Sequence, residues 1–166
     1  MPIALPRPQQ ICTLTTPGEP AWKDNQFHNP FSSCMGLFRT SGGHICRAGV
    51  FWDGQSHGER AQWFGTKMTY YMPSNAGALV TIGPGKPKWT ELPNFWYMLP
   101  KPMRHDSGHG GSHTFITHEF IAALVENREP AVDIYEALAM TVPGLIAHQS
   151  ALKNGEQLKV PSFDKA

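Results

Sequence analysis

The residues best suited to chemistry are histidines that gather in one glycine-containing segment. The candidate site residues in that segment are Arg104, His105, His109, Gly110, Gly111 and His113. An imidazole can donate to or accept from a hydroxyl group, and it changes charge near neutral pH. Glycine has no side chain and lets a ligand approach the backbone closely. These residues therefore predict a substrate-binding site for a hydroxyl-rich or anionic small molecule.

The histidine segment lies where a loop is expected to become a helix. Apolar residues recur at spacings of three and four from Phe115 to Leu124, which predicts a helix from about residue 112 to 126. Ser112 is a plausible N-cap, and the first N–H groups and the helix dipole favour anions or hydroxyl groups. The alternative is purely structural: the glycines form the turn, and the histidines cap the helix or stack.

Metal binding is another interpretation of the same histidines. His105, His109, His113 and His118 are spaced four, four and five residues apart, and histidines four apart on a helix can chelate zinc. The intervening glycines disfavour a helix there, and no His-Glu-x-x-His pattern is present. We therefore expect no metal site, and a metal-dependent hydrolase is the less favoured alternative.

A second polar loop, residues 53–60, contains His57, which could point into a binding cleft. A solvated connection between two strands explains this loop equally well. The aromatic run Phe95–Tyr97 could stack on a sugar ring or fill the core.

The elements that must position these residues are strands first and helices afterwards. Strand-like runs are expected at residues 34–40, 45–52, 60–64, 68–72 and 78–82, and glycine turns join the first two pairs. A second helix is expected from Asp133, which begins a capping box, to about residue 154, and a short strand follows it. This order predicts an α+β fold, an open and mostly antiparallel sheet with helices packed on one face.

Two segments are expected within the chain. Residues 1–30 are rich in proline, which fixes φ and removes an N–H donor, and they predict an irregular arm. Residues 31–166 form the α+β domain. Its many aromatic residues predict an open sheet face that a second copy of the chain covers, and hence a homo-oligomer.

Composition excludes several classes of protein. The net charge of +1 and the lack of a basic cluster argue against nucleic-acid binding. No run approaches the ~20 apolar residues of a membrane helix, and residues 1–8 do not resemble a signal peptide. Three cysteines at no metal-like spacing indicate reduced thiols in a cytoplasmic protein. No Gly-x-Gly-x-x-Gly follows a strand, so no nucleotide-binding motif is present.

Taken in order, these segments resemble the C-terminal domain of the Gfo/Idh/MocA oxidoreductase superfamily, which has a dihydrodipicolinate-reductase-like fold. The resemblance is carried by residues 51–67, by His109–His113 with His118–Phe120, by residues 130–155, and by Val160–Phe163. It implies a sheet that mediates oligomer contacts and a cleft that binds a sugar or polyol.

The resemblance also implies what is missing. The family's Rossmann domain and its Glu-Lys-Pro motif have no counterpart here. We therefore expect the chain to bind no cofactor alone, whereas NAD or NADP is implied for a full-length relative. The expected function is that of a substrate-binding and oligomerisation domain that is inactive alone. A standalone carbohydrate-binding or scaffolding module and a fragment of an NAD-dependent glycosidase are the alternatives.

Overall fold

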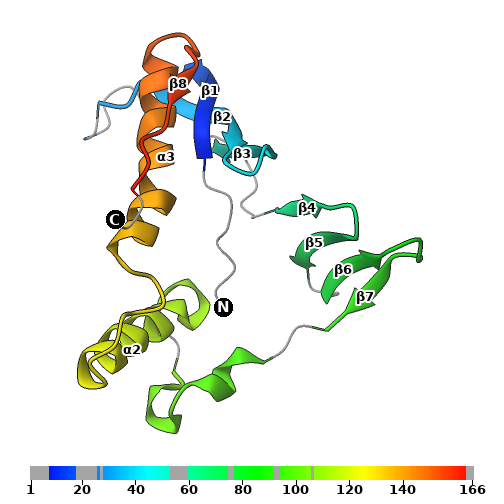
Figure 1. Ribbon diagram of the computed structural model, residues 1–166, viewed down its shortest axis with the longest axis vertical. Coiled ribbons are helices and arrows are strands. Elements are labelled where there is room, and N and C mark those ends of the chain that lie inside the picture. The colour runs from blue at the N-terminus through cyan, green and yellow to red at the C-terminus, as the bar shows by residue number, and fades with distance from the viewer. Residues whose placement is uncertain are drawn as a thin grey trace. The chain divides into compact units, whose positions relative to one another are not determined.

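The computed structural model describes residues 8–17, 26, 28–52, 60–74, 77–91, 94–105 and 107–163. The chain divides into two compact units, residues 1–55 with 129–166 and residues 56–128. Each unit contains one four-stranded sheet, and both sheets are antiparallel (Figure 1). No described helix combines the length and apolar character that crossing a membrane requires.

The first unit is built around β1 (Pro8–Pro17), which lies inside the sheet order β3-β2-β1-β8. Our prediction of an irregular arm over residues 1–30 is wrong for this segment. Its prolines stand at the two ends of the strand, so residues 9–16 keep every N–H donor. Ile11 in this strand is 1% exposed and forms the centre of the core.

The predicted hairpin is confirmed in β2 (Phe31–Thr40) and β3 (Ile45–Phe51), which pair from Ser33↔Phe51 to Arg39↔Ile45. Gly43 has a φ of 77°, a left-handed value that glycine adopts at little cost and that this turn requires. The strand β3 forms one edge of the sheet and is exposed along its whole length.

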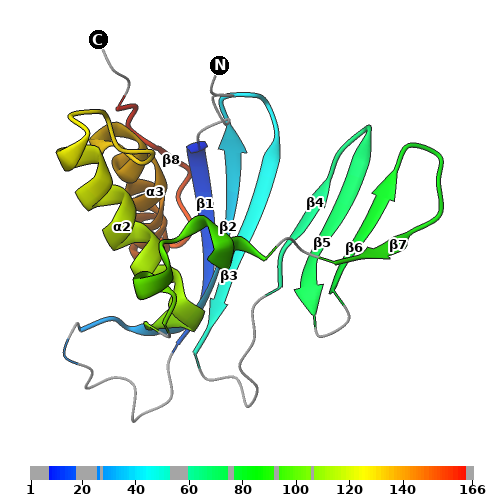
Figure 2. The same cartoon turned by 90° about the horizontal axis from the view of Figure 1, so that it is seen from below.

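The helix α3 (Ile134–Leu152) packs on β1, and β8 (Leu158–Lys159) pairs with the other edge of β1 (Figure 2). The predicted cap is confirmed, because the Asp133 side chain accepts a hydrogen bond from the Glu136 N–H. Pro143 lies inside the helix, as the sequence indicates, and is buried.

The second unit contains the sheet β4 (Gln62–Phe64), β5 (Met68–Ser74), β6 (Gly77–Ile82) and β7 (Lys88–Thr90), in that order. The predicted hairpin at residues 60–72 and the fifth strand are confirmed. The strand β7 is not among the strands that we predicted. It extends the sheet through pairing with β6, for example at Leu79↔Trp89.

Three short 3-10 turns follow the sheet: η1 (Phe95–Met98), η2 (Lys101–Met103) and η3 (His109–Gly111). The last leads directly into α2 (Ser112–Val125), the first predicted helix. Beyond α2, Arg128 forms salt bridges with Glu119 and Glu126, and their hydrogen bonds raise the pKa of the Arg128 guanidinium.

Candidate functional site

The predicted histidine segment does occupy a loop-to-helix junction, formed by residues 107–114. Two glycines there have left-handed backbone angles, with φ of 48° at Gly108 and 93° at Gly111. His109 also has a positive φ, 47°, which non-glycine residues rarely adopt. Such angles reverse the chain within a few residues and bring η3 against the start of α2.

The junction brings His109 and His113 together. Their ring centroids are 5.0 Å apart, the ring planes are inclined by 55°, and both residues are exposed. Two neighbouring imidazoles open to solvent can each donate a hydrogen bond to a bound hydroxyl group or accept one from it. Among the predicted site residues, His109 and His113 are therefore the two whose side chains lie close enough to contact one ligand together.

At both glycines, a neighbouring ring leaves no room for a side chain. A Cβ atom at Gly108 would collide with the His113 imidazole, and one at Gly111 would collide with the Trp96 indole. The close approach at Gly111 is therefore made by Trp96 of the same unit, whereas we had expected a ligand there. The Trp96 ring also contacts Phe115, with centroids 5.9 Å apart, so this member of the aromatic run packs inside the unit.

The start of α2 is capped by a residue that the sequence did not single out. Gly111 is the N-cap and makes no side-chain cap bond, and Ser112, the residue we expected there, is already helical. The Ser107 hydroxyl instead accepts from the Thr114 N–H at 3.1 Å and also contacts the Thr114 hydroxyl. Ser107 precedes the helix by five residues, outside the usual N-cap spacing, so no local signal identifies it.

The remaining predicted site residues have other surroundings. The Arg104 guanidinium donates to the carbonyl oxygens of Leu99 at 2.8 Å and Tyr97 at 3.3 Å, and it lies 5.2 Å from the Tyr97 ring centroid. These contacts brace the turns η1 and η2. His105 is exposed on the following bend, and Gly110 lies within η3. His57 lies outside the described residues.

The zinc alternative was based on the histidine spacing. In the described part of the chain, no three residues among His, Cys, Asp and Glu are grouped so that they could hold a metal ion. Cys12, Cys34 and Cys46 are free thiols.

Comparisons with known proteins agree with the fold. Residues 92–166 match the family model "Glycosyl hydrolase 109, C-terminal domain". No curated protein sequence matches the chain. Among solved structures, a levoglucosan dehydrogenase in complex with NADH has a TM-score of 0.68 and 11% identity, over 94% of this chain and 45% of its own.

Two further oxidoreductases are similar. An enzyme from Agrobacterium radiobacter, in complex with NAD+, L-tartaric acid and magnesium, has a TM-score of 0.63 and 13% identity, over 92% of this chain and 43% of its own. The aldose-aldose oxidoreductase from Caulobacter crescentus, in complex with glycerol, has a TM-score of 0.60 and 14% identity, over 93% and 42%. The chain thus spans less than half the length of these structures. The predicted α+β fold is confirmed.

Proposed function

We propose that this chain, which has the fold of the C-terminal domain of Gfo/Idh/MocA oxidoreductases, is the substrate-binding and oligomerisation domain of an NAD- or NADP-dependent sugar or polyol oxidoreductase. The observation that carries the proposal is the extent of the match. Almost the whole chain superimposes on less than half of dehydrogenases that bind NADH. A nucleotide-binding domain supplied by another part of a longer protein, or by a partner chain, would complete the enzyme. In such a protein the dinucleotide would supply or accept the hydride.

The His109–His113 pair is the substrate side of this proposal. Its imidazoles can hydrogen-bond the hydroxyl groups of a sugar or polyol. We retain Arg104, His105, Gly110, Gly111 and His57 as proposed members of the site, and Arg104 and Gly111 support it through the contacts described above.

Substrate binding is tested by titrating neutral monosaccharides and polyols into the chain and following the imidazole NMR signals. The signals of His109 and His113 should shift together, and His109→Ala should abolish the shift of His113 if one ligand bridges the pair. His118→Ala, on the same helix, is the matched control and should leave the titration unchanged. Shifts that are equal in all histidines would contradict a site at this pair.

The sheet β4–β7 supports self-association. The register places Phe64, Tyr71 and Trp89 on one face and Trp63, Tyr70 and Ile82 on the other. Four of these side chains are more than half exposed, at 56% for Trp63, 71% for Phe64, 71% for Ile82 and 59% for Trp89. Apolar area of this kind on both faces is typical of a sheet that a partner covers.

The oligomer is tested by sedimentation over a range of protein concentrations. Trp89→Lys and Ile82→Lys place a charge on opposite faces, so the variant that dissociates the oligomer identifies the face that is buried. A wild-type chain that sediments as a monomer at high concentration would remove oligomerisation from the proposal.

The cofactor proposal is tested by calorimetry with NADH and NADPH. The isolated chain should bind neither. A protein that also contains a nucleotide-binding domain should bind one of them, oxidise it with a keto sugar, and reduce its oxidised form with a sugar alcohol. Tight binding of either cofactor by the 166-residue chain would contradict the proposal that a separate domain binds the nucleotide. We also propose a cytoplasmic location, which the three free thiols support.

A glycosidase that uses NAD is the second candidate, favoured by the match of residues 92–166 to a glycosyl hydrolase model. The two candidates differ in their net reaction. With a chromogenic glycoside, a glycosidase releases the aglycone with catalytic amounts of NAD, whereas an oxidoreductase produces NADH in proportion to the product.

A further inference from the structure

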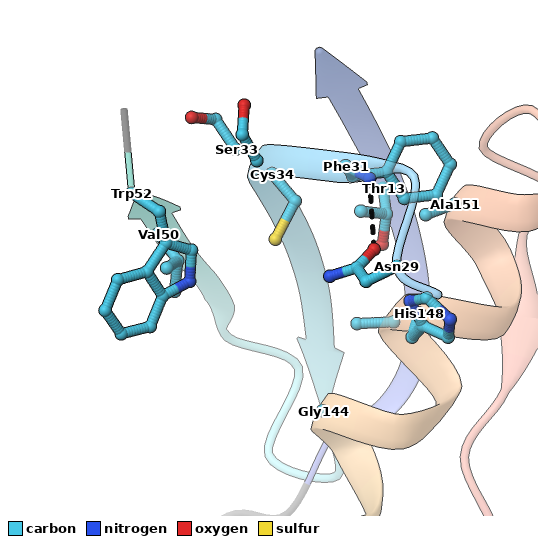
Figure 3. A pocket seen from close by; sticks show the side chains of 12 residues that line it. Thr13, Asn29, Phe31, Ser33, Cys34, Val50, Trp52, Gly144, His148 and Ala151 are labelled. Carbon is cyan, nitrogen blue, oxygen red and sulfur yellow. Dashed lines mark hydrogen bonds between the residues drawn. The ribbon is translucent and has the colours of Figure 1, made fainter. Parts of the chain in front are cut away.

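The two faces of the first sheet carry different side chains. Cys34 and Val50 pair across β2 and β3, and both line a pocket with Gly144 and His148 of α3 (Figure 3). They therefore point to the face that α3 covers. Side chains alternate between the two faces of a strand, so the odd-numbered residues of β2 and β3 point to the opposite face. We call that face, together with the residues of β1 and β8 in register with it, the outer face.

The outer face is positively charged. Arg47 of β3 stands opposite Leu37 of β2. Two residues further along, Ile45 stands opposite Arg39, so the two arginines occupy one diagonal of this block and the two aliphatic side chains occupy the other. Lys159 of β8 belongs to the same cross-strand row as Arg39. None of the four strands contains an Asp or a Glu, so no acidic side chain of the sheet itself neutralises these cations.

A groove of about 370 Å³ lies on the outer face and is open to solvent. Gln157, which precedes β8, and Gly43 of the hairpin turn form its ends. Ile11 and Phe38 also line it, and because their side chains point to the α3 face they contribute backbone atoms. Among the described lining residues, Arg39 is the one that carries a charge. The outer-face residues of the groove are Gln10, Cys12, Leu37, Arg39 and Ile45.

The neutral polar side chains of the groove have protein partners, whereas Arg39 has none in the described part of the chain. The Cys12 thiol donates to a backbone carbonyl oxygen at 3.0 Å. The Gln157 amide nitrogen donates to the Gln10 amide oxygen at 2.9 Å. Among the described residues, Arg39 takes part in no ion pair and no side-chain hydrogen bond. Its guanidinium is therefore the group of the groove that is available to a ligand.

Apolar surface adjoins that guanidinium. Leu37 is 49% exposed and Ile45 is 83% exposed. A residue directly opposite on the neighbouring strand lies about 5 Å away, and the next residue on the same face of one strand lies about 7 Å away. A ligand group bound by Arg39 can therefore carry an aliphatic chain that reaches both apolar side chains.

We propose that this groove binds a small organic acid that has one carboxylate and a short aliphatic chain. The planar guanidinium of Arg39 matches the two oxygen atoms of a carboxylate. The chain of the acid covers Leu37 and Ile45 and removes their apolar surface from water. One lining cation among neutral side chains balances a single negative charge, which favours a carboxylate over a doubly charged phosphate. The groove belongs to the first unit and does not depend on the His109–His113 pair.

Hexanoate, acetate and 1-hexanol are matched probes. Acetate lacks the chain of hexanoate, and 1-hexanol lacks its charge. Titration of the ¹⁵N-labelled full chain, followed through the Arg39 Nε–H and Gln10 side-chain amide NMR signals, measures binding at the groove itself. Hexanoate should shift both signals and bind roughly tenfold more tightly than acetate, because part of its chain is buried. 1-Hexanol should leave the Arg39 signal in place.

Variants of exposed residues separate a defined site from diffuse attraction. Arg39→Gln should weaken hexanoate binding roughly fivefold or more, through loss of the bidentate contact. Arg47→Gln is the matched control: it removes an equal charge from the same face outside the groove and should cost less than about twofold. Ile45→Thr keeps the branched shape and should weaken hexanoate but not acetate. His109→Ala should change none of these titrations.

Four results would overturn the proposal. Unmoved Arg39 and Gln10 signals at the highest soluble hexanoate concentration would show that the groove holds only solvent. Equal losses in Arg39→Gln and Arg47→Gln would show that the attraction is spread over the face. Equal affinity for hexanoate and acetate would remove the apolar contact from recognition. Tighter binding of inorganic phosphate than of hexanoate would show that the groove prefers another anion.

Discussion

The Ser150 side chain joins three segments of the first unit, and its loss should be costly. Ser150 is 0% exposed on α3. Its hydroxyl group donates to the Glu156 carbonyl oxygen at 2.8 Å and accepts from the Thr13 N–H at 3.1 Å. The strand β8 pairs with β1 only at Gln10 and Ile11. Beyond the end of β8, the Ser150 hydroxyl accepts the hydrogen bond of the Thr13 N–H in β1.

Ser150→Ala removes both hydrogen bonds and leaves the buried Thr13 N–H without a partner. Two hydrogen bonds contribute about 1 kcal/mol each, and a stranded buried donor adds to that cost, so the free energy of unfolding should fall by about 2–4 kcal/mol. Because the total stability of a domain is about 5–15 kcal/mol, this is a large fraction. Urea denaturation followed by circular dichroism should show a midpoint lowered by roughly 1–2 M.

Thr13→Val is the matched control, since it changes the neighbouring side chain and keeps the backbone hydrogen bond to Ser150. It removes a buried hydroxyl group that has no partner and should leave stability unchanged or raise it by about 1 kcal/mol. Hydrogen exchange gives a local measurement: the Thr13 amide should exchange faster in Ser150→Ala. A loss below about 0.5 kcal/mol with unchanged Thr13 exchange would refute the reasoning.

Further expectations concern the ends of the helices. Gly111→Ala should destabilise the second unit by more than Gly83→Ala. Both glycines have positive φ, but only a Cβ at Gly111 meets the Trp96 ring. Thermal melts of the two variants measure the difference, and equal melting temperatures would contradict the expectation. Asp133→Ala should lower the free energy of unfolding by about 1 kcal/mol through loss of the α3 cap, and Asp133→Asn should restore most of it in the same denaturation assay.

The sequence determined those parts of the secondary structure that depend on contacts between residues close together along the chain. The Gly43 turn fixes the β2–β3 hairpin, and the Asp133 cap begins α3, since both depend on contacts within a few residues. The resemblance to the oxidoreductase domain could be recognised because its segments keep their order along the chain.

Tertiary structure decided what depends on partners distant in sequence. Residues 8–17 have the composition of an irregular arm, yet they form an inner strand of the sheet because β2 and β8 supply hydrogen-bond partners on both sides. Ser107 caps α2 only because left-handed glycines fold the loop back. The packing of α3 on β1 buries Ser150 and Ala151 and joins Ser150 to Thr13, 137 residues earlier in the chain. No periodicity along one segment reports such contacts, since each one joins atoms that only the folded chain brings within bonding distance.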